Sequence, residues 1–232
     1  MTLPKLLLIS TSTVFGTGYL DHAEAEIRNT MGATRRVLFI PYALADHATY
    51  ASKAVSRFER MGFQCRSIED GTDPLRALND ADAVFVGGGN TFRLLKALHE
   101  LGLIEGIRRC VGQGMIYMGA SAGSNVAGPT IRTTNDMPIV EPPTLKALNL
   151  FPYQINPHYL DTDPDSRHMG ETREERLQQY LEENQTPVIA LREGAMLSVG
   201  EGRIRLRGVS GARVFRRDRA PEEWLPPADV LI

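Results

Sequence analysis

A short apolar run that leads into a G-x-S-x-G motif sets the first restriction on the fold of this chain. Met115–Met118 has the character of a buried strand, and Gly119-Ala-Ser-Ala-Gly123 follows it directly. This spacing is typical of a nucleophile elbow, a sharp turn between a strand and a helix that exposes the serine hydroxyl above a sheet. The same spacing also occurs at turns that only need small residues. A catalytic Ser121 therefore requires a base, an orienting acid and an oxyanion site elsewhere in the chain.

The segments before the motif alternate between apolar runs and amphipathic stretches. Strands that alternate with helices predict right-handed βαβ units and a parallel sheet. Ligands of such sheets bind beyond the carboxyl ends of the strands, where Gly87–Gly89 and Ser121 both fall. The pattern predicts strands at residues 6–10, 36–41, 63–68 and 83–86, helices at 21–31, 47–61, 91–101 and 104–111, and a short helix opened by Asp73-Pro74.

The pattern changes after the motif. Residues 131–143 show little periodicity, and no stretch has the composition of a linker, so we expect a single domain spanning residues 1–232. The fold class is α/β, with a mostly parallel central sheet and a C-terminal antiparallel extension. The predicted elements are strands at 151–157 and 188–191, a helix from 170 to about 183, antiparallel strands within 195–215 and an irregular proline-containing tail.

Composition excludes several classes of function. The 232 residues carry a net charge of −2 and contain no basic block, which argues against nucleic-acid binding. There is no Lys/Arg-rich amphipathic segment for a membrane surface, and no apolar run approaches the ~20 residues of a membrane-spanning helix. Cys65 and Cys110 are far apart and form no C-x-x-C motif, so we expect reduced thiols and a cytoplasmic protein.

A nucleophilic serine needs a histidine base. His158 follows Asn156-Pro157, just past a predicted strand and on the same rim as Ser121. A solvated loop histidine is the alternative interpretation of His158. The other histidines are His22, His47, His99 and His168, and the first three fall on predicted helices or their edges, where solvated side chains are the better explanation.

The base must in turn be oriented by an acid or an amide. Glu193 follows the predicted strand 188–191 and precedes Gly194. Asp136 lies in the loop Thr133-Thr-Asn-Asp-Met137. A solvated glutamate and an Asx-turn, respectively, are the structural alternatives, so the residues alone leave this choice open.

Donors for a developing oxyanion are also present. Gly87-Gly-Gly-Asn90 can expose backbone N–H groups, and Ala122 offers one beside the nucleophile. A phosphate cradle is the rival interpretation of the glycine run, but Phe92 stands where the dinucleotide motif needs a third glycine. The histidines are scattered and no H-E-x-x-H motif occurs, so we expect neither a metal site nor a cofactor.

With these residues in place, the sequence resembles the peptidase E family of bacterial aspartyl dipeptidases. The resemblance covers almost the whole chain, and the run from Pro129 to Val140 is too long for chance agreement. The matching segments are Val86-Gly-Gly-Gly-Asn-Thr-Phe92, Gly119-x-Ser-Ala-Gly123, Pro129-Thr-Ile-Arg-Thr-Thr-Asn-Asp-Met-Pro-Ile-Val140, Leu150-Phe-Pro-x-Gln-Ile-Asn-Pro-His158 and Gly170-Glu-Thr-Arg-Glu174.

The resemblance implies a serine peptidase on a flavodoxin-like three-layer α/β sandwich, related to class I glutamine amidotransferases. It implies Ser121 as the nucleophile, His158 as the base and Glu193 as the acid that orients the base. It also implies an oxyanion hole formed by the backbone N–H groups of Gly89 and Ala122. The implied substrate is a small acidic dipeptide with an N-terminal aspartate, and the implied assembly is a monomer or a homodimer.

A substrate of this kind needs a cation for the aspartyl carboxylate and an acid for the α-amine. A guanidinium binds a carboxylate in bidentate fashion, which makes Arg173 in the matching Gly-Glu-Thr-Arg segment the first candidate and Arg132 the second. Asp136 or Glu171 is the candidate partner of the α-amine. Asn90, beside the glycine run, completes the predicted substrate-binding residues.

One position departs from the family. Ala120 precedes the nucleophile where the enterobacterial enzymes carry tryptophan, which predicts a roomier pocket and a less strict preference for aspartate. Two alternatives to an aspartyl dipeptidase remain. One is a cyanophycinase-like hydrolase of β-aspartyl-linked peptides on the same scaffold, and the other is a non-catalytic binding module for acidic small molecules.

Overall fold

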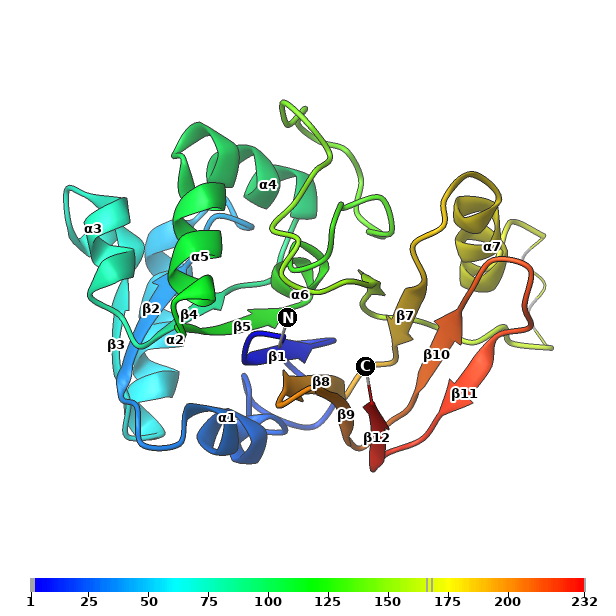
Figure 1. Cartoon of the computed structure of the whole chain (residues 1–232), viewed down its shortest axis with the longest axis horizontal. Coiled ribbons are helices and arrows are strands. Elements are labelled where there is room, and N and C mark those ends of the chain that lie inside the picture. The colour runs from blue at the N-terminus through cyan, green and yellow to red at the C-terminus, as the bar shows by residue number, and fades with distance from the viewer. Residues whose placement is uncertain (1–2, 166, 168, 232) are drawn as a thin grey trace.

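The computed structural model describes residues 3–165, 167 and 169–231 of the chain. Its centre is an eight-stranded sheet with the strand order β12-β9-β8-β1-β5-β4-β2-β3 (Figure 1). From β1 to β3 across this order neighbouring strands are parallel, and β8, β9 and β12 extend the sheet in antiparallel fashion. The strands are β1 Leu6–Ile9, β2 Arg36–Ile40, β3 Gln64–Ser67, β4 Ala83–Val86, β5 Ile116–Ala120, β8 Ala195–Gly200, β9 Arg203–Gly208 and β12 Ala228–Leu231.

Helices cover both faces of this sheet (Figure 1). Successive residues of β1, such as Leu7 and Leu8, point into separate apolar clusters because side chains alternate between the two faces of a sheet. One cluster contains residues of α1 and α2, and the other contains residues of α3, α4 and α5. The helices are α1 Glu24–Met31, α2 His47–Arg60, α3 Pro74–Asn79, α4 Thr91–Glu100 and α5 Leu103–Gly112, and a 3-10 turn, η1, covers Ile68–Asp70.

The parallel part of the sheet follows a flavodoxin-like arrangement with one change of connection. The strands β2 to β5 lie in the order β3-β2-β4-β5, which corresponds to the flavodoxin order 2-1-3-4. β1 comes first along the chain but lies beside β5, in the place of the fifth flavodoxin strand. The predicted three-layer α/β sandwich with a C-terminal antiparallel extension is confirmed.

The helices begin at the residues that cap them. Asp46 accepts a hydrogen bond from the Thr49 N–H at the start of α2, and Asn90 accepts one from the Arg93 N–H at the start of α4. Such caps satisfy N–H groups that have no partner within the helix. Both caps follow strands at the carboxyl edge of the sheet, so they also fix the loops around the glycine run.

A second, four-stranded sheet with the order β11-β10-β7-β6 stands beside the first (Figure 1). Helix α7 packs on it through a separate apolar cluster that includes Leu177, Leu181 and Phe215. Thr172 and Glu175 form a capping box at the start of this helix. The elements are β6 Gln154–Asn156, α7 Arg173–Glu183, β7 Val188–Leu191, β10 Ala212–Phe215 and β11 Glu222–Trp224.

One sequence prediction is corrected here. The tail is not irregular, because β11 and β12 pair with β10 and β9 as edge strands. The prolines of the tail lie outside the strands: Pro221 precedes β11, and Pro226 and Pro227 lie between β11 and β12. A missing N–H at these positions costs no ladder hydrogen bond. The antiparallel strands predicted within 195–215 are present, and β10 leaves β9 to pair with β7 in the second sheet.

Two observations bear on the environment of the protein. Among residues 3–165, 167 and 169–231, no helix is long and apolar enough to cross a membrane. Cys65 and Cys110 both carry free thiols. A cytoplasmic location stays a prediction.

The Asp82 carboxylate ties the start of β2 to the start of β4, and we expect Asp82→Asn to destabilise the fold at neutral pH. Asp82 accepts hydrogen bonds from the backbone N–H groups of Arg35 and Arg36 and from the Arg36 guanidinium at 2.7 Å. The Arg36 side chain, followed by these N–H groups, lowers the pKa of Asp82 to about 2. A lowered pKa stabilises the folded state above the unfolded pKa of ~3.9, and the gain is lost as pH falls towards 2.

Urea unfolding should therefore show Asp82→Asn to be about 1–2 kcal/mol less stable than the wild type at pH 7. The difference should shrink steadily between pH 4 and pH 2. Asp80→Asn is the matched control, because Asp80 only forms an exposed ion pair with Arg66 at 3.7 Å. A difference for Asp82→Asn that does not change with pH would contradict this explanation.

Candidate active site

Ser121 lies at the turn between β5 and the short helix α6 (Ala122–Asn125). Its backbone angles are φ 52° and ψ −111°, a conformation that residues with a side chain rarely adopt. Three hydrogen bonds of 2.9 Å hold this turn: the Ser121 N–H donates to Ile9 O, and the N–H groups of Ser124 and Asn125 donate to Ser121 O. Strain that persists because surrounding contacts enforce it is typical of functional sites.

Gly123 shows why the predicted elbow needs small residues. A Cβ atom at this position would lie 2.1 Å from the carbonyl oxygen of Val86, at the end of β4. The start of α6 therefore packs directly on the backbone of the neighbouring strand. This contact sets the position of Ser121 relative to the glycine run that follows β4.

The structure brings the three predicted catalytic side chains into one hydrogen-bonded chain. The Ser121 Oγ atom lies 2.8 Å from Nε2 of His158, and Nδ1 of His158 lies 3.0 Å from Oε1 of Glu193. His158 follows β6 and Glu193 follows β7, so the two residues reach Ser121 from the second sheet. The three residues are far apart in the sequence, and only the tertiary structure makes them neighbours.

Ser10 holds the backbone of His158 in place. The Ser10 side chain is fully buried, accepts a hydrogen bond from the His158 N–H at 3.0 Å and donates one to Leu191 O at 2.9 Å. His158 has a φ of 55°, so it is a second residue of the site in an uncommon backbone conformation. The hydroxyl at the end of β1 thus links the first sheet to the end of β7.

The predicted oxyanion donors also lie beside Ser121. Gly89 has a φ of +138°, and a Cβ atom there would lie 2.5 Å from Ala43 O, so this loop conformation requires glycine. Among the described residues, neither the Gly89 N–H nor the Ala122 N–H has a protein acceptor. Two free N–H groups near a serine hydroxyl can stabilise negative charge that develops on a bound carbonyl oxygen.

A cavity of about 620 Å³ opens at this point, and we call it the Ser121 cavity. Gly89, Ser121, Asp136 and His158 line it together with residues of α2 and of the loop after β1. The cavity lies at the carboxyl ends of β1, β4 and β5, which is where ligands of open α/β sheets bind. Its volume is within the usual range for small-molecule sites.

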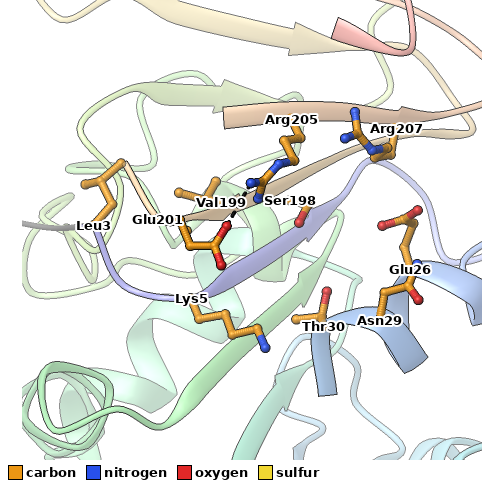
Figure 2. Close-up of a pocket in the computed structure, with 11 residues that line it drawn as sticks. Leu3, Lys5, Glu26, Asn29, Thr30, Ser198, Val199, Glu201, Arg205 and Arg207 are labelled. Atoms are coloured by element: carbon orange, nitrogen blue, oxygen red, sulfur yellow. Dashed lines mark hydrogen bonds and ion pairs between the residues drawn. The ribbon is translucent and has the colours of Figure 1, made fainter. Parts of the chain in front are cut away.

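Another cavity, of about 440 Å³, lies at the opposite edge of the sheet, near the start of β1 (Figure 2). Both arginines that line it are paired, Arg205 with Glu201 at 2.9 Å and Arg207 with Asp229 at 3.0 Å. The residues that line it include no histidine beside a serine or cysteine. The chemistry of a nucleophile and its base is therefore found in the Ser121 cavity.

Asp136 is the predicted substrate residue that lines the Ser121 cavity. Its Oδ2 atom accepts hydrogen bonds from the backbone N–H and the hydroxyl of Thr91 and from the hydroxyl of Thr134. Asn90, in contrast, is the cap of α4, and its Nδ2 donates to Met137 O at 2.9 Å. Asn90 does not line the cavity, and its substrate-binding role stays a prediction.

The predicted cations and the second acid lie outside the lining of the cavity. Arg173 is half-buried behind the Asp136 loop, and its Nη1 donates to Asn135 Oδ1 at 2.6 Å. Burial lowers the pKa of the Arg173 guanidinium from its usual value. Arg132 is exposed, and Glu171 is exposed at the start of α7, where it accepts a hydrogen bond from Gln179.

Sequence reasoning missed Tyr19 and Lys53, which line the cavity, and Ser10, which is buried and holds the backbone of His158. Ser10 had one available signal, because it directly follows an apolar strand and so lies on the same rim as Ser121. Tyr19 and Lys53 carry no local signal. Ala120 is fully buried with Tyr19 and Tyr50 and does not line the cavity, so these two tyrosines form the wall on that side.

Within residues 3–165, 167 and 169–231, no three His, Cys, Asp or Glu side chains come together as metal ligands would. His22, His47 and His99 lie away from the Ser121 cavity, and His168 lies outside the described residues. The groups that the site offers are thus a hydroxyl, an imidazole, carboxylates and free backbone N–H groups.

Comparison with known proteins agrees with the resemblance seen in the sequence. The family model "Peptidase family S51" matches residues 6–207. A protein of Streptomyces coelicolor named "Peptidase E" is 54% identical over 226 residues, which cover 97% of this chain and 93% of that protein. A protein of Drosophila melanogaster named "Probable alpha-aspartyl dipeptidase" is 44% identical over 229 residues, which cover 97% of this chain and 95% of that protein.

Solved structures show the same fold. The crystal structure of a peptidase from an acI-B1 Actinobacterium aligns with a TM-score of 0.72 at 15% identity, covering 100% of this chain and 98% of that chain. The family model covers well over half of the sequence, and the relatives match nearly its full length. The resemblance to peptidase E is confirmed: this chain belongs to Peptidase family S51 and is a serine-type peptidase.

Proposed function

We propose that this peptidase hydrolyses dipeptides with an N-terminal aspartate through an acyl-enzyme on Ser121. The observation that carries the proposal is the continuous hydrogen-bonded chain from Ser121 through His158 to Glu193 beside two free backbone N–H groups. Nucleophile, base, orienting acid and oxyanion donors are the parts that serine peptidases share across unrelated folds. Here Ser121, His158 and Gly89 line one cavity of dipeptide size, and Glu193 reaches it through its hydrogen bond to His158.

The first half of the reaction forms the acyl-enzyme. His158 Nε2 takes the proton of the Ser121 hydroxyl while Oγ attacks the carbonyl carbon of the aspartyl residue. The carbonyl oxygen becomes an oxyanion that accepts hydrogen bonds from the N–H groups of Gly89 and Ala122. His158 then gives the proton to the leaving amine, the C–N bond breaks, and the aspartyl group remains as an ester on Ser121.

The second half releases aspartate. A water molecule attacks the ester carbonyl while His158 Nε2 takes one of its protons, and collapse of the second oxyanion returns that proton to Ser121 Oγ. Glu193 accepts a hydrogen bond from Nδ1–H of His158, which keeps Nε2 free to act as the base and stabilises the imidazolium that forms. The arrangement thus assigns each proton of the cycle to a named atom.

The preference for aspartate rests on the charges beside the cavity and on the relatives. Among the described residues, every hydrogen bond to the Asp136 carboxylate goes to Oδ2. Oδ1 can therefore accept a hydrogen bond from the substrate α-amine. Arg173 lies behind the same loop through its bond to Asn135, and a shift of this side chain would present its guanidinium to the aspartyl carboxylate. The name of the Drosophila relative refers to the same specificity.

A panel of substrates tests this proposal. The purified protein should cleave Asp-Leu with a kcat/KM about 10- to 100-fold above that for Asn-Leu, because a lost charged contact costs about 1.5–3 kcal/mol and leaves the cation unpaired. It should not release dipeptides from a β-aspartyl-arginine polymer. Cleavage of the polymer in preference to Asp-Leu would contradict the proposal and favour the cyanophycinase-like alternative.

Arg173→Ala should weaken Asp-Leu cleavage about 10- to 100-fold while changing Asn-Leu cleavage little, since only the first substrate offers a carboxylate. The measurement is kcat/KM for both substrates. Arg176→Ala on the same helix is the matched control, because Arg176 is exposed and pairs with Glu171 at 3.7 Å. Equal losses on Asp-Leu and Asn-Leu would reject the role of Arg173, and a selective loss in Arg132→Ala would transfer it to the second candidate.

A further inference from the structure

Lys53 is the cation that lines the Ser121 cavity, and no step of the proposed reaction uses it. It projects from α2 and is exposed. No carboxylate of the described residues forms an ion pair with it. An ammonium group in a ligand-sized cavity without a counter-ion can bind an anionic group of the ligand.

Among the described residues, the acids that line the cavity form no ion pair with Lys53. Asp46 caps α2 by accepting a hydrogen bond from Thr49 N–H at 3.0 Å. Asp136 is bound at Oδ2 by Thr91 and Thr134 on the other side of the cavity. The positive charge of Lys53 is therefore available to a ligand.

Tyr19 supplies a second donor at the same place. Its side chain is 8% exposed and lines the cavity, and its hydroxyl has no hydrogen-bond partner among the described residues. The Lys53 Nζ lies 4.6 Å from the centre of the Tyr19 ring, a cation–π contact that positions the ammonium group over this wall. Burial raises the pKa of the Tyr19 phenol well above its usual value, so the hydroxyl remains a neutral donor.

Lys53 and Asp136 lie over opposite faces of the central sheet. Asp136 binds Thr91 at the start of α4, which packs in the same cluster as α3 and α5. Lys53 belongs to α2, which packs with α1 on the other face. Ser121 stands between them at the end of β5, so a substrate whose acyl residue contacts Asp136 extends its leaving residue towards Lys53.

We propose that Lys53 and Tyr19 bind the C-terminal carboxylate of the leaving residue. This inference rests on the proposed Asp-X activity and assigns the second half of the substrate. The carboxylate follows the leaving nitrogen after a single Cα atom, so it falls within the same cavity only when the leaving group is one residue long. Longer peptides place an uncharged peptide group there, which explains a preference for dipeptides by the chemistry of the cavity.

The test compares Asp-Leu with Asp-Leu amide, which lacks the C-terminal charge, in the wild type and in Lys53→Met. The wild type should favour Asp-Leu about 10- to 100-fold in kcat/KM, and Lys53→Met should reduce this ratio to within about threefold. The loss should appear mainly in KM, because this contact is the same in the ground state and the transition state. Tyr19→Phe should reduce the ratio in the same direction by a smaller factor.

Two comparisons make the outcome decisive. Lys96→Met removes a half-exposed lysine that pairs with Glu100 on α4, away from the cavity, and the ratio should stay at its wild-type value. The inference is overturned if Lys53→Met keeps the wild-type ratio of Asp-Leu to Asp-Leu amide. It is also overturned if Lys53→Met instead lowers the ratio of Asp-Leu to Asn-Leu. Either result leaves the proposed function standing. A wild type that cleaves neither Asp-Leu nor its amide rejects the proposed function itself, and this result is distinguishable because it needs no variant.

Discussion

Ser121→Ala is expected to lower kcat/KM for Asp-Leu by at least ~10⁴-fold, the loss typical of a missing triad member. The substitution removes the only atom that forms the ester in the proposed cycle. The fold should persist, because the hydrogen bonds that hold the elbow involve the backbone N–H and carbonyl of Ser121 and not its hydroxyl. Urea unfolding should place Ser121→Ala within about 1 kcal/mol of the wild type.

The control for this prediction is Ser56→Ala, which removes a hydroxyl from an exposed position of α2. It should leave both the cleavage rate and the stability unchanged. Turnover by Ser121→Ala at a rate close to that of the wild type would reject the acyl-enzyme. Loss of activity together with loss of the folded state would contradict the conclusion that the elbow does not depend on the Ser121 hydroxyl.

Gly123→Ala should impair both folding and catalysis, because the new methyl group meets the backbone of β4 and not a movable side chain. The 2.1 Å approach to Val86 O requires α6 or β4 to shift. Overpacking of this kind costs about 1–3 kcal/mol in stability. A displacement of Ser121 by about 1 Å would lower kcat about 100-fold.

Gly112→Ala provides the matched comparison, since Gly112 is the last residue of α5 and a Cβ atom there would meet nothing within 4 Å. This variant should be as stable as the wild type or slightly more stable, because alanine favours helices over glycine. Thermal unfolding and kcat for Asp-Leu are the measurements. Wild-type values for Gly123→Ala would show that the elbow tolerates a larger residue and would contradict the close-packing argument.

The sequence predicts the parallel part of the fold because its signals are local. Most of the parallel strands are short apolar runs, as in β4, and several of the helices begin at a recognisable cap such as Asn90. In the second sheet this signal is clear only for β7, another short apolar run. β6 and β11 have three residues each, and β10 pairs with β7, which lies before β8 and β9 in the chain.

The residues of the candidate site also differ in how well the sequence predicts them. Ser121 is predictable from the residues around it, because the elbow is a local structure whose small neighbours are visible in the sequence. His158 and Glu193 are visible as residues after strands, but the residues alone left Glu193 and Asp136 as competing acids. In the structure Glu193 lies within hydrogen-bond distance of His158, whereas Asp136 accepts a hydrogen bond from the Thr91 N–H at the start of α4.

The pocket wall opposite Asp136 could not be predicted from the sequence. Lys53 and Tyr19 lie on separate segments, and a lysine on an amphipathic helix is more often a solvated residue. Their proximity depends on how α2 packs over the loop after β1, which is a property of the tertiary structure. Ser10 follows β1 of the first sheet and acts through hydrogen bonds to Leu191 and His158 at the ends of β7 and β6, and no pattern in the sequence indicates these partners.

Partitioning of the aspartyl group between water and hydroxylamine tests the acyl-enzyme on Ser121 most directly. If Asp-Leu and Asp-Phe form the same ester on Ser121, both substrates must give the same ratio of aspartyl hydroxamate to aspartate at a given hydroxylamine concentration. The measurement is the two product concentrations during turnover by the wild type. We predict a common ratio that rises with hydroxylamine, whereas a ratio that depends on the leaving residue, or aspartate as the sole product at every concentration, would contradict the acyl-enzyme.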